Sequence, residues 1–312
     1  MAVSGATGFI GAALTQRLAR EGKGHEVIPL VRRPPRPSER AIAWDPARGT
    51  IDRGALEGCD AVVHLAGENV FGRWTPAKKQ RIRESRVAGT RLVSEAIAGL
   101  TRRPRILLAA SAVGYYGDQG AAELTEQSPR RGAGGGGGGA DDFLADVARD
   151  WEAATGPAAR AGVRVANLRF GVVLAKTGGA LAKMLPTFRL GLGGPIGSGA
   201  QYFPWIELDD ALGAMLHVLA TESLSGPVNV TAPHPVTQLE FARTLGRVLR
   251  RPALLPVPPF ALGLVFGREA AAFMGSGQRV LPARLLASGY RFRFGELDPA
   301  LRHLLAAPGS GS

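Results

Sequence analysis

The residues Met1-Ala2-Val3-Ser4-Gly5-Ala6-Thr7-Gly8-Phe9-Ile10-Gly11 decide the fold of this chain. A short apolar strand leads directly into glycines spaced G-x-x-G-x-x-G, and apolar residues then recur at helical spacing from Ile10 to Leu18. In a strand–turn–helix unit such glycines allow a tight bend, close approach to a pyrophosphate and close packing of the helix on the sheet. The amino terminus of the helix faces the phosphates with its amides and its dipole. We therefore predict a dinucleotide site that includes the turn residues Gly5, Thr7, Gly8, Phe9, Ile10 and Gly11.

The end of the second strand indicates which dinucleotide binds. In such folds an acidic residue about 20 positions after the glycines takes the ribose hydroxyls of NAD. The second strand here, at 27–31, is followed instead by Arg32 and Arg33. Two guanidinium groups at this position suit a 2′-phosphate, although both could equally be solvated loop residues. We therefore favour NADP(H) over NAD(H).

Composition narrows the class of protein. The chain has 312 residues, 45% of them hydrophobic, which is enough for a sizeable core in one large or two closely packed domains. No apolar run is long enough to cross a bilayer and no signal sequence precedes the first strand, so we expect a cytoplasmic protein without a membrane partner. The single cysteine, Cys59, excludes an intrachain disulfide framework, and the histidines lack metal-ligand spacing.

The net charge of +12 does not by itself indicate nucleic acid. The basic residues are scattered and lack a long run or interleaved aromatic residues, so we expect no nucleic-acid partner. A small-molecule substrate suits this charge as well as a polyanion does.

Strands and helices alternate through the first half of the chain. Largely apolar runs at 61–66, 105–111 and 163–170 are typical of buried parallel strands, and helical periodicity covers 76–100 and 141–160. This order predicts an α/β fold with a Rossmann-like, doubly wound parallel sheet and right-handed crossovers.

Beyond Gly171 the pattern breaks into Gly- and Pro-rich segments, with helices expected at 210–221, 237–250 and 282–288. We predict a smaller C-terminal α/β substrate lobe over the carboxyl ends of the strands. The expected division is as follows: an NADP(H)-binding Rossmann domain at 1–170, completed by about 206–232; a substrate lobe at 171–205 and 233–306; and a disordered tail at 307–312. The glycine run at 132–139 is expected to be a flexible spacer, or alternatively a lid.

Several segments together resemble the extended short-chain dehydrogenase/reductases, the relatives of nucleotide-sugar epimerases and dehydratases. These segments are 5–11, 60–67, 111–117 and 168–174. The chain is further similar to an atypical, epimerase-like branch, through segments that include 68–69, 73–75, 85–86, 191–194, 205–206 and 276–282.

The resemblance extends the set of expected site residues. It implies further cofactor contacts at Leu65, Ala66, Gly67 and Arg86. We expect substrate contacts from Glu68, Asn69, Lys183 and Trp205. It also implies a homodimer through the helices at 76–100 and 141–160.

Active members of this superfamily use a Tyr-x-x-x-Lys pair, in which the tyrosinate is the acid or base and the lysine lowers its pKa. The corresponding helix here, 143–152, contains neither residue. Ser111, Tyr115 and Tyr116 remain as catalytic candidates, with Arg86 or Arg169 as the charge partner. Two hypotheses therefore stay open: an NADP(H)-dependent, epimerase-like oxidoreductase acting on a small carbonyl or hydroxyl substrate, and a non-catalytic NADP(H)-binding sensor or regulatory protein.

Overall fold

The computed structural model describes residues 1–22, 24–36, 38–131 and 143–306. Its largest sheet contains eight strands: β1 (Ala2–Ser4), β2 (Ile28–Val31), β3 (Ile42–Asp45), β4 (Thr50–Ile51), β5 (Ala61–His64), β6 (Ile106–Ala112), β8 (Arg164–Phe170) and β12 (Gly226–Val230). The strand order is β12-β8-β6-β5-β1-β2-β3-β4, and only the β3–β4 pair is antiparallel.

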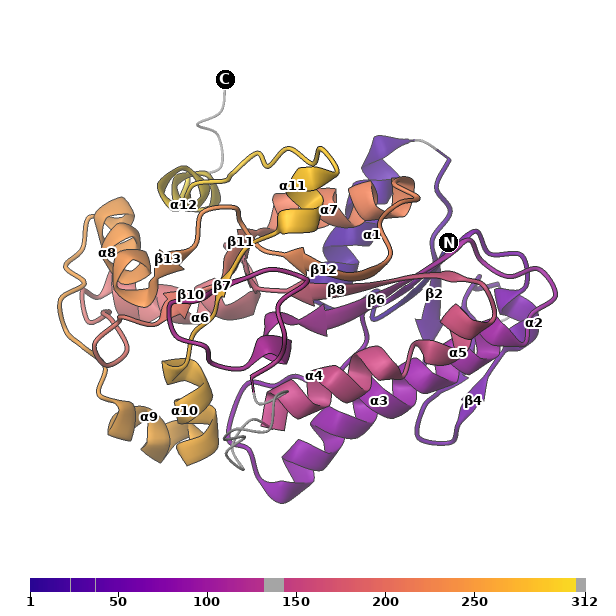
Figure 1. Cartoon of the computed structure of the whole chain (residues 1–312), viewed down its shortest axis with the longest axis horizontal. Coiled ribbons are helices and arrows are strands. Elements are labelled where there is room, and N and C mark those ends of the chain that lie inside the picture. Colours follow the sequence, from indigo (N-terminus) through magenta and orange to yellow (C-terminus); the bar gives the residue numbers. More distant parts are fainter. Residues whose placement is uncertain (23, 37, 132–142, 307–312) are drawn as a thin grey trace.

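Helices cover both faces of this sheet (Figure 1). One face carries α1 (Phe9–Glu21), α7 (Leu208–Ala220) and α11 (Ala283–Ala287); the other carries α3 (Pro76–Ala98), α4 (Phe143–Ala153) and α5 (Gly156–Arg160), and the short α2 (Arg53–Leu56) lies at the β4 end. Each face therefore buries its own apolar layer, with Leu14 and Leu18 of α1 in one and Val93 and Ile97 of α3 in the other. This three-layer arrangement is the predicted Rossmann-like α/β fold.

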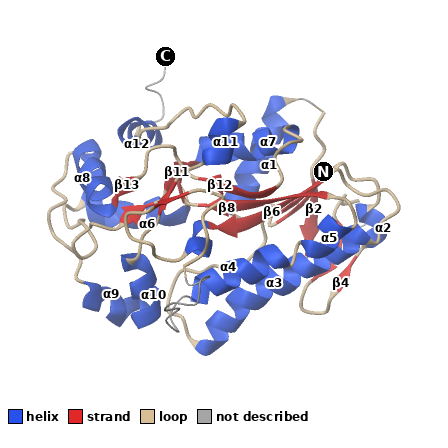
Figure 2. Cartoon of the chain, viewed as in Figure 1, coloured by secondary structure: helices blue, strands red, loops and turns tan. Residues whose placement is uncertain are grey.

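The remaining elements gather beside the β12 end of the sheet (Figure 2). Three two-stranded sheets are formed by β9 (Val172–Leu174) with β11 (Trp205–Glu207), β10 (Tyr202–Phe203) with β13 (Val236–Thr237), and β7 (Glu123–Leu124) with β14 (Arg279–Val280). The other helices are α6 (Gly179–Arg189), α8 (Gln238–Leu249), α9 (Pro259–Phe266), α10 (Arg268–Gly275), α12 (Leu297–Leu305) and the short 3₁₀ turn η1 (Val113–Tyr116). None of the described helices is long and apolar enough to cross a membrane.

The predicted elements recur with small shifts at their ends, and one is corrected. The helix expected at 141–160 is two helices, because Gly156 and Pro157 interrupt it after α4 ends at Ala153. Residues 132–142 and 307–312 lie outside the described part of the chain, and so do the predictions made for the glycine run and the tail. The proposed division into two domains stays a prediction.

Candidate functional site

The turn between β1 and α1 has the tight packing that its glycines predict. Gly5 adopts a positive φ of 70°, and a Cβ there would lie 3.0 Å from the backbone nitrogen of Ala66. A Cβ on Gly11 would lie only 2.1 Å from the carbonyl oxygen of Gly5. The amide of Gly8 donates to that same carbonyl at 2.9 Å, which closes the turn. Side chains at Gly5 and Gly11 are thus excluded by backbone atoms rather than by movable groups.

The amino terminus of α1 is open to an anion. Its N-cap, Gly8, offers no side-chain acceptor, and the first turn holds no acidic residue. By contrast, Thr75 caps α3 and Thr237 caps α8 through hydroxyl oxygens. The first amides of α1 therefore need another acceptor, such as a phosphate group or water.

A cleft of about 570 Å³ lies at the carboxyl ends of β1, β2 and β5, in front of this turn. It brings together cofactor residues predicted from three separate segments of the chain. The described residues that line it are Gly5, Ala6, Thr7, Gly8, Pro29, Leu30, Val31, Arg32, Arg33, Trp44, Pro46, Leu65, Ala66, Gly67, Glu68 and Ser85. The glycine cradle and the open helix end fit the diphosphate of a dinucleotide, and the β2 end lies where its adenosine ribose would reach.

The two predicted phosphate-binding arginines differ in their surroundings. The guanidinium of Arg33 forms a bidentate ion pair with Glu39, with both N–O distances 2.6 Å. This pairing lowers the pKa of Glu39 to about 2. The exposed side chain of Arg32, within the described part of the chain, has no hydrogen bond or ion pair. Arg32 is therefore the arginine that is free for an anion.

Arg86 does not line the cleft but supports one wall of it. Its guanidinium donates to the carbonyl of Glu68 at 2.9 Å and lies over the ring of Trp151, 5.0 Å from its centroid. A Cβ on Gly67 would contact it at 3.4 Å. Burial lowers the pKa of Arg86 to about 10. The residue positions the 66–68 loop from behind.

A buried pair, Ser4 and His64, holds the same loop from the side of the sheet. The hydroxyl of Ser4 accepts the amides of Leu65 and Ala66, at 3.2 Å and 3.3 Å. Its own proton is then directed to Nδ1 of His64 at 2.7 Å, which places the ring proton on Nε2. That Nε2 has no partner among the described residues, and Trp44 packs edge-on against the ring. Burial lowers the pKa of His64 to about 4.

This burial predicts a pH effect on folding. Between pH 6.5 and about 4 the unfolded chain protonates His64 while the folded chain does not. The folded-state pKa is depressed, so the stabilisation is complete above pH 6.5 and is lost as the pH falls, by up to ~3 kcal/mol. Glu207 acts in the opposite sense, because burial raises its pKa to about 7 and its contribution is lost as the pH rises. We expect the stability of wild type relative to His64→Asn to decrease from pH 7 to pH 5, as measured by urea unfolding.

The comparison of variants removes the contribution of Glu207, since both proteins carry it. A stability difference that stays constant over this range would contradict the buried neutral state of His64.

Ser111 and Tyr116 lie in a buried polar network centred on Glu152 and Arg169. Glu152 accepts the hydroxyl proton of Ser111 at 2.7 Å and two N–H groups of Arg169 at 2.8 Å each. Arg169 also donates to the hydroxyl oxygen of Tyr116 at 2.9 Å, and this hydroxyl donates to the side chain of Asn229 at 2.7 Å. The network joins the carboxyl ends of β6, β8 and β12 to α4.

The network bears on the prediction that Ser111 and Tyr116 are catalytic, which stays a prediction. Tyr116 is fully buried and Ser111 is 3% exposed, so neither hydroxyl is open to a substrate. Burial raises the pKa of Tyr116 to about 12, even though Arg169 acts to lower it. These geometries fit structural roles, because a proton donor must reach the reacting group.

Tyr115 is the predicted catalytic residue that stays accessible. It is half-buried, and its ring lies 3.6 Å from the guanidinium carbon of Arg169, edge-on to the ring of Tyr116. Arg169, rather than Arg86, is therefore the cation beside the tyrosines.

The predicted substrate residues divide into three groups. Asn69 and Lys183 both contact Phe71: the ammonium of Lys183 lies 3.4 Å from its ring centroid, and its backbone amide donates to the side chain of Asn69. Glu68 lines the cleft but is paired with Lys78 at 2.8 Å. Trp205 is 1% exposed and packs in an apolar core with residues of α8, so the substrate contact predicted for it stays a prediction that its burial does not favour.

Sequence reasoning missed several residues around this site. Ser4, Trp44 and Glu152 hold or line it, yet Ser4 and Trp44 belong to no motif, and Glu152 follows Trp151 in what reads as an ordinary amphipathic helix. Gly178 and Gly179 were also missed, although side chains there would collide with Phe9 at the start of α1. The paired glycines are the one local signal that could have drawn attention to this contact.

The structure brings three potential metal ligands together, although the sequence indicates no metal site. The ligand atoms of Glu207, Asp209 and His303 lie within 4.8 Å of one another. Glu207 already accepts the amides of Asp209 and Asp210 as the cap of α7, and Arg293 lies 4.0 Å from Asp209. These contacts explain why the two carboxylates lie together without a metal ion: Glu207 caps α7, and Asp209 lies beside a cation.

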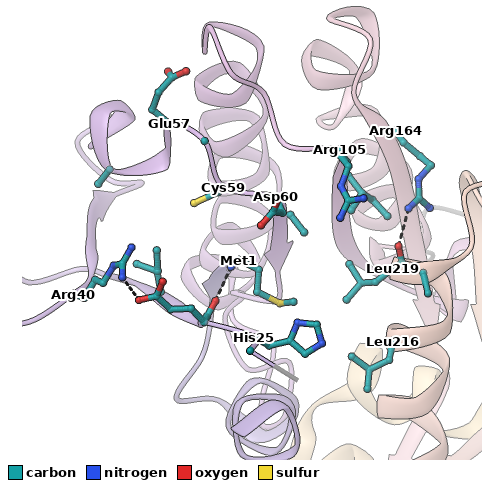
Figure 3. Close-up of a pocket in the computed structure, with 18 of the residues that line it drawn as sticks. Met1, His25, Arg40, Glu57, Cys59, Asp60, Arg105, Arg164, Leu216 and Leu219 are labelled. Carbon is teal, nitrogen blue, oxygen red and sulfur yellow. Dashed lines mark hydrogen bonds and ion pairs between the residues drawn. The ribbon is translucent and has the colours of Figure 1, made fainter. Parts of the chain in front are cut away.

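A second cleft of about 1220 Å³ lies at the opposite, amino-terminal edge of the strands (Figure 3). Two of its cations are already engaged: Arg40 pairs with Glu26, and Arg164 donates to carbonyls at the end of α7, including that of Leu219. In doubly wound sheets ligands bind at the carboxyl edge, so the smaller cleft is the candidate site.

Comparisons with known proteins identify relatives of this chain. The model of the NAD dependent epimerase/dehydratase family matches residues 1–134, and a domain of unknown function (DUF1731) matches residues 257–304. The epimerase family protein SDR39U1 of Bos taurus is 43% identical over 311 residues, covering 97% of this chain and 99% of the relative. The epimerase family protein YfhF of Bacillus subtilis is 36% identical over 308 residues, covering 98% of each.

Solved structures extend the comparison. The crystal structure of human SDR39U1 (isoform 2) with NADPH matches with a TM-score of 0.84 and 40% identity, covering 97% of this chain and 98% of that one. A nucleoside-diphosphate sugar epimerase from Corynebacterium glutamicum matches with a TM-score of 0.75 and 37% identity, covering 97% of this chain and 57% of that one. MoeE5 in complex with UDP-glucose and NAD, at 20% identity and a TM-score of 0.72, shares the fold.

Proposed function

Because this chain belongs to the epimerase family, with relatives of the SDR39U1 type, we propose that it is an NADP(H)-dependent oxidoreductase acting on a small carbonyl or hydroxyl compound. One observation carries the proposal: the glycine cradle, the open end of α1 and the unpaired Arg32 line a single cleft. The human relative crystallised with NADPH supports the same cofactor.

The cleft residues would divide the cofactor between them. The amides at the start of α1 would receive the diphosphate, and Gly5 and Gly8 would let it approach the backbone. Ala66 and Gly67 would lie beside the adenosine and its ribose. Arg32 would take the 2′-phosphate through charge-assisted hydrogen bonds.

The chemistry then needs little from the protein. When bound, NADPH supplies the hydride that a carbonyl carbon accepts as the carbonyl is reduced to an alcohol and NADP⁺ is formed. The protein must orient the carbonyl and deliver one proton to its oxygen. Tyr115 is only half-buried and its ring packs on the Arg169 guanidinium, so we assign that proton to its hydroxyl, with Asn69 and Lys183 orienting the substrate.

The unequal surroundings of the two arginines lead to a prediction. Arg32→Ala should weaken NADPH binding by about 10-fold or more and leave NADH binding unchanged, because a charge-assisted contact contributes ~1.5–3 kcal/mol. Arg33→Ala should have a smaller effect, since Glu39 already occupies both of its terminal nitrogens. Calorimetric titration of each variant with NADPH and with NADH measures both affinities.

Glu39→Gln is the matched control. It releases Arg33 from its ion pair and should tighten NADPH binding without affecting NADH. If wild type binds NADPH and NADH with equal affinity, neither arginine recognises the 2′-phosphate. If wild type binds neither nucleotide, the cofactor assignment is refuted.

A second candidate function is a non-catalytic NADP(H)-binding sensor. The observation that favours it is the burial of Ser111 and Tyr116 within the Glu152–Arg169 network, together with the missing Tyr-x-x-x-Lys pair. NADPH oxidation with a panel of aldehydes, ketones and nucleotide-sugar ketones distinguishes the two. Turnover that Tyr115→Phe abolishes supports the enzyme, whereas tight NADPH binding without turnover of any compound supports the sensor.

A further inference from the structure

Six large apolar side chains lie exposed on the part of the molecule that carries α6, α8 and α9. Their exposed fractions run from 55% to 76%. They are Leu190, Leu192, Leu254, Leu255, Phe260 and Leu264, here called the leucine patch. Scattered single apolar residues are ordinary on protein surfaces, but several in neighbouring segments indicate an interaction site.

Backbone contacts place the segments that carry the leucine patch beside one another. The loop after α6 runs along the loop before α9: the amide of Val257 donates to the carbonyl of Pro195, and Gly197 donates to Val257. A Cβ on Gly191 would touch Pro252. Phe260 and Leu264 are four residues apart on α9 and therefore point to the same side of that helix. Figure 1 places these loops and α9 at one end of the molecule.

Basic residues border the patch. Arg189, Arg250 and Arg251 are exposed, and within the described part of the chain none of them forms an ion pair. Arg251 donates only to a carbonyl, that of Arg189. The sequences 189–206 and 241–268 contain no aspartate or glutamate. An apolar surface bordered by unpaired cations complements a surface that is apolar inside and negatively charged outside.

We propose that the leucine patch docks this protein on the surface of an anionic lipid bilayer. The leucines and Phe260 would enter the interface between headgroups and acyl chains, and the three arginines would meet lipid phosphates. A second copy of the chain fits less well, since a two-fold interface on this patch would gather the arginines of both copies without an aspartate or glutamate from 189–206 or 241–268 to pair with them. Such docking needs no membrane-spanning helix, and none of the described helices is long and apolar enough to be one.

Co-sedimentation with vesicles tests the proposal on the full chain. Vesicles of phosphatidylcholine with phosphatidylglycerol should bind the protein, and Leu254→Ser/Leu255→Ser should weaken this binding by about 10-fold or more. Arg250→Asn should also weaken it several-fold, because it removes one of the cations that meet lipid phosphates. Asparagine is the replacement because it tolerates the left-handed backbone at that position. Binding should fall when salt is raised from about 0.1 M to about 0.5 M.

Two controls separate docking from the general attraction of a chain of charge +12. Leu286→Ser removes an exposed leucine on α11, and Arg105→Gln removes an exposed arginine at the opposite edge of the sheet. Both should bind vesicles as wild type does. Equal losses in the controls and the patch variants, or absence of binding to the anionic vesicles, would overturn the proposal. The proposal would also be overturned if the wild-type protein does not bind the vesicles but self-associates in sedimentation velocity, and the leucine substitutions abolish that self-association.

Discussion

Replacing Gly11 by alanine should abolish NADPH binding, with an increase in Kd of about 100-fold or more. The new Cβ would lie 2.1 Å from the carbonyl oxygen of Gly5, and its neighbours are backbone atoms that cannot rotate away. Either α1 withdraws from the sheet or the turn opens, and both movements displace the amides that we assign to the diphosphate. The same overlap should lower the free energy of unfolding by ~1–3 kcal/mol.

Gly263→Ala is the matched control, because it is also a glycine within a helix but a Cβ there meets nothing within 4 Å. It should be neutral or stabilising by up to ~1 kcal/mol. Calorimetric titration with NADPH and urea unfolding of both variants measure the two effects. NADPH affinity of Gly11→Ala within a few-fold of wild type would show that the cofactor does not rest on this turn.

The turn around Gly11 is also the part of the molecule that sequence reasoning predicts best. Its glycines, the strand before it and the helix after it are local, so spacing alone identifies them. The parallel strands could be predicted for a related reason: strands buried on both faces are continuous apolar runs, as at 61–64 and 106–110.

Elements outside the main sheet were harder to predict. The pairs β10–β13 and β14–β7 contain only two residues in each strand, too short for an alternating pattern. Their partners are distant in sequence, with Arg279 beside Glu123, so the tertiary contact rather than the local propensity determines them.

The candidate site was predictable only where its residues form a local sequence pattern. Residues that contact a cofactor through the backbone leave glycines in the sequence, whereas polar networks leave only scattered polar letters. Glu152 is 41 residues from Ser111 and 17 from Arg169, and no spacing connects the three. For Trp205 a substrate contact is expected from its place beside Glu207 and Asp209 at the lobe junction, and its side chain packs in the apolar core.

The Glu152–Arg169 pair should be the most costly single contact to break in the described structure. The side chain of Arg169 is only 4% exposed, and Glu152→Ala leaves its guanidinium without the carboxylate that pairs with it. Desolvation acts to lower the pKa of Arg169, but the hydrogen bonds and charge of Glu152 outweigh it and raise that pKa, so the pair stays ionised. Removing one partner of such a buried pair lowers the free energy of unfolding by ~3–5 kcal/mol. Urea unfolding at pH 7 measures the loss.

Two further variants test whether the unpaired charge causes this loss. Asp150→Ala, on the same helix, removes a half-buried carboxylate from its ion pairs with Arg83 and Arg149 and should change stability by no more than ~1 kcal/mol. The double variant Glu152→Ala/Arg169→Met removes both charges, so it should be more stable than Glu152→Ala alone. If the double variant instead loses the sum of the two single effects, Glu152 and Arg169 act independently. The network would then not be what joins α4 to the carboxyl ends of β6 and β8.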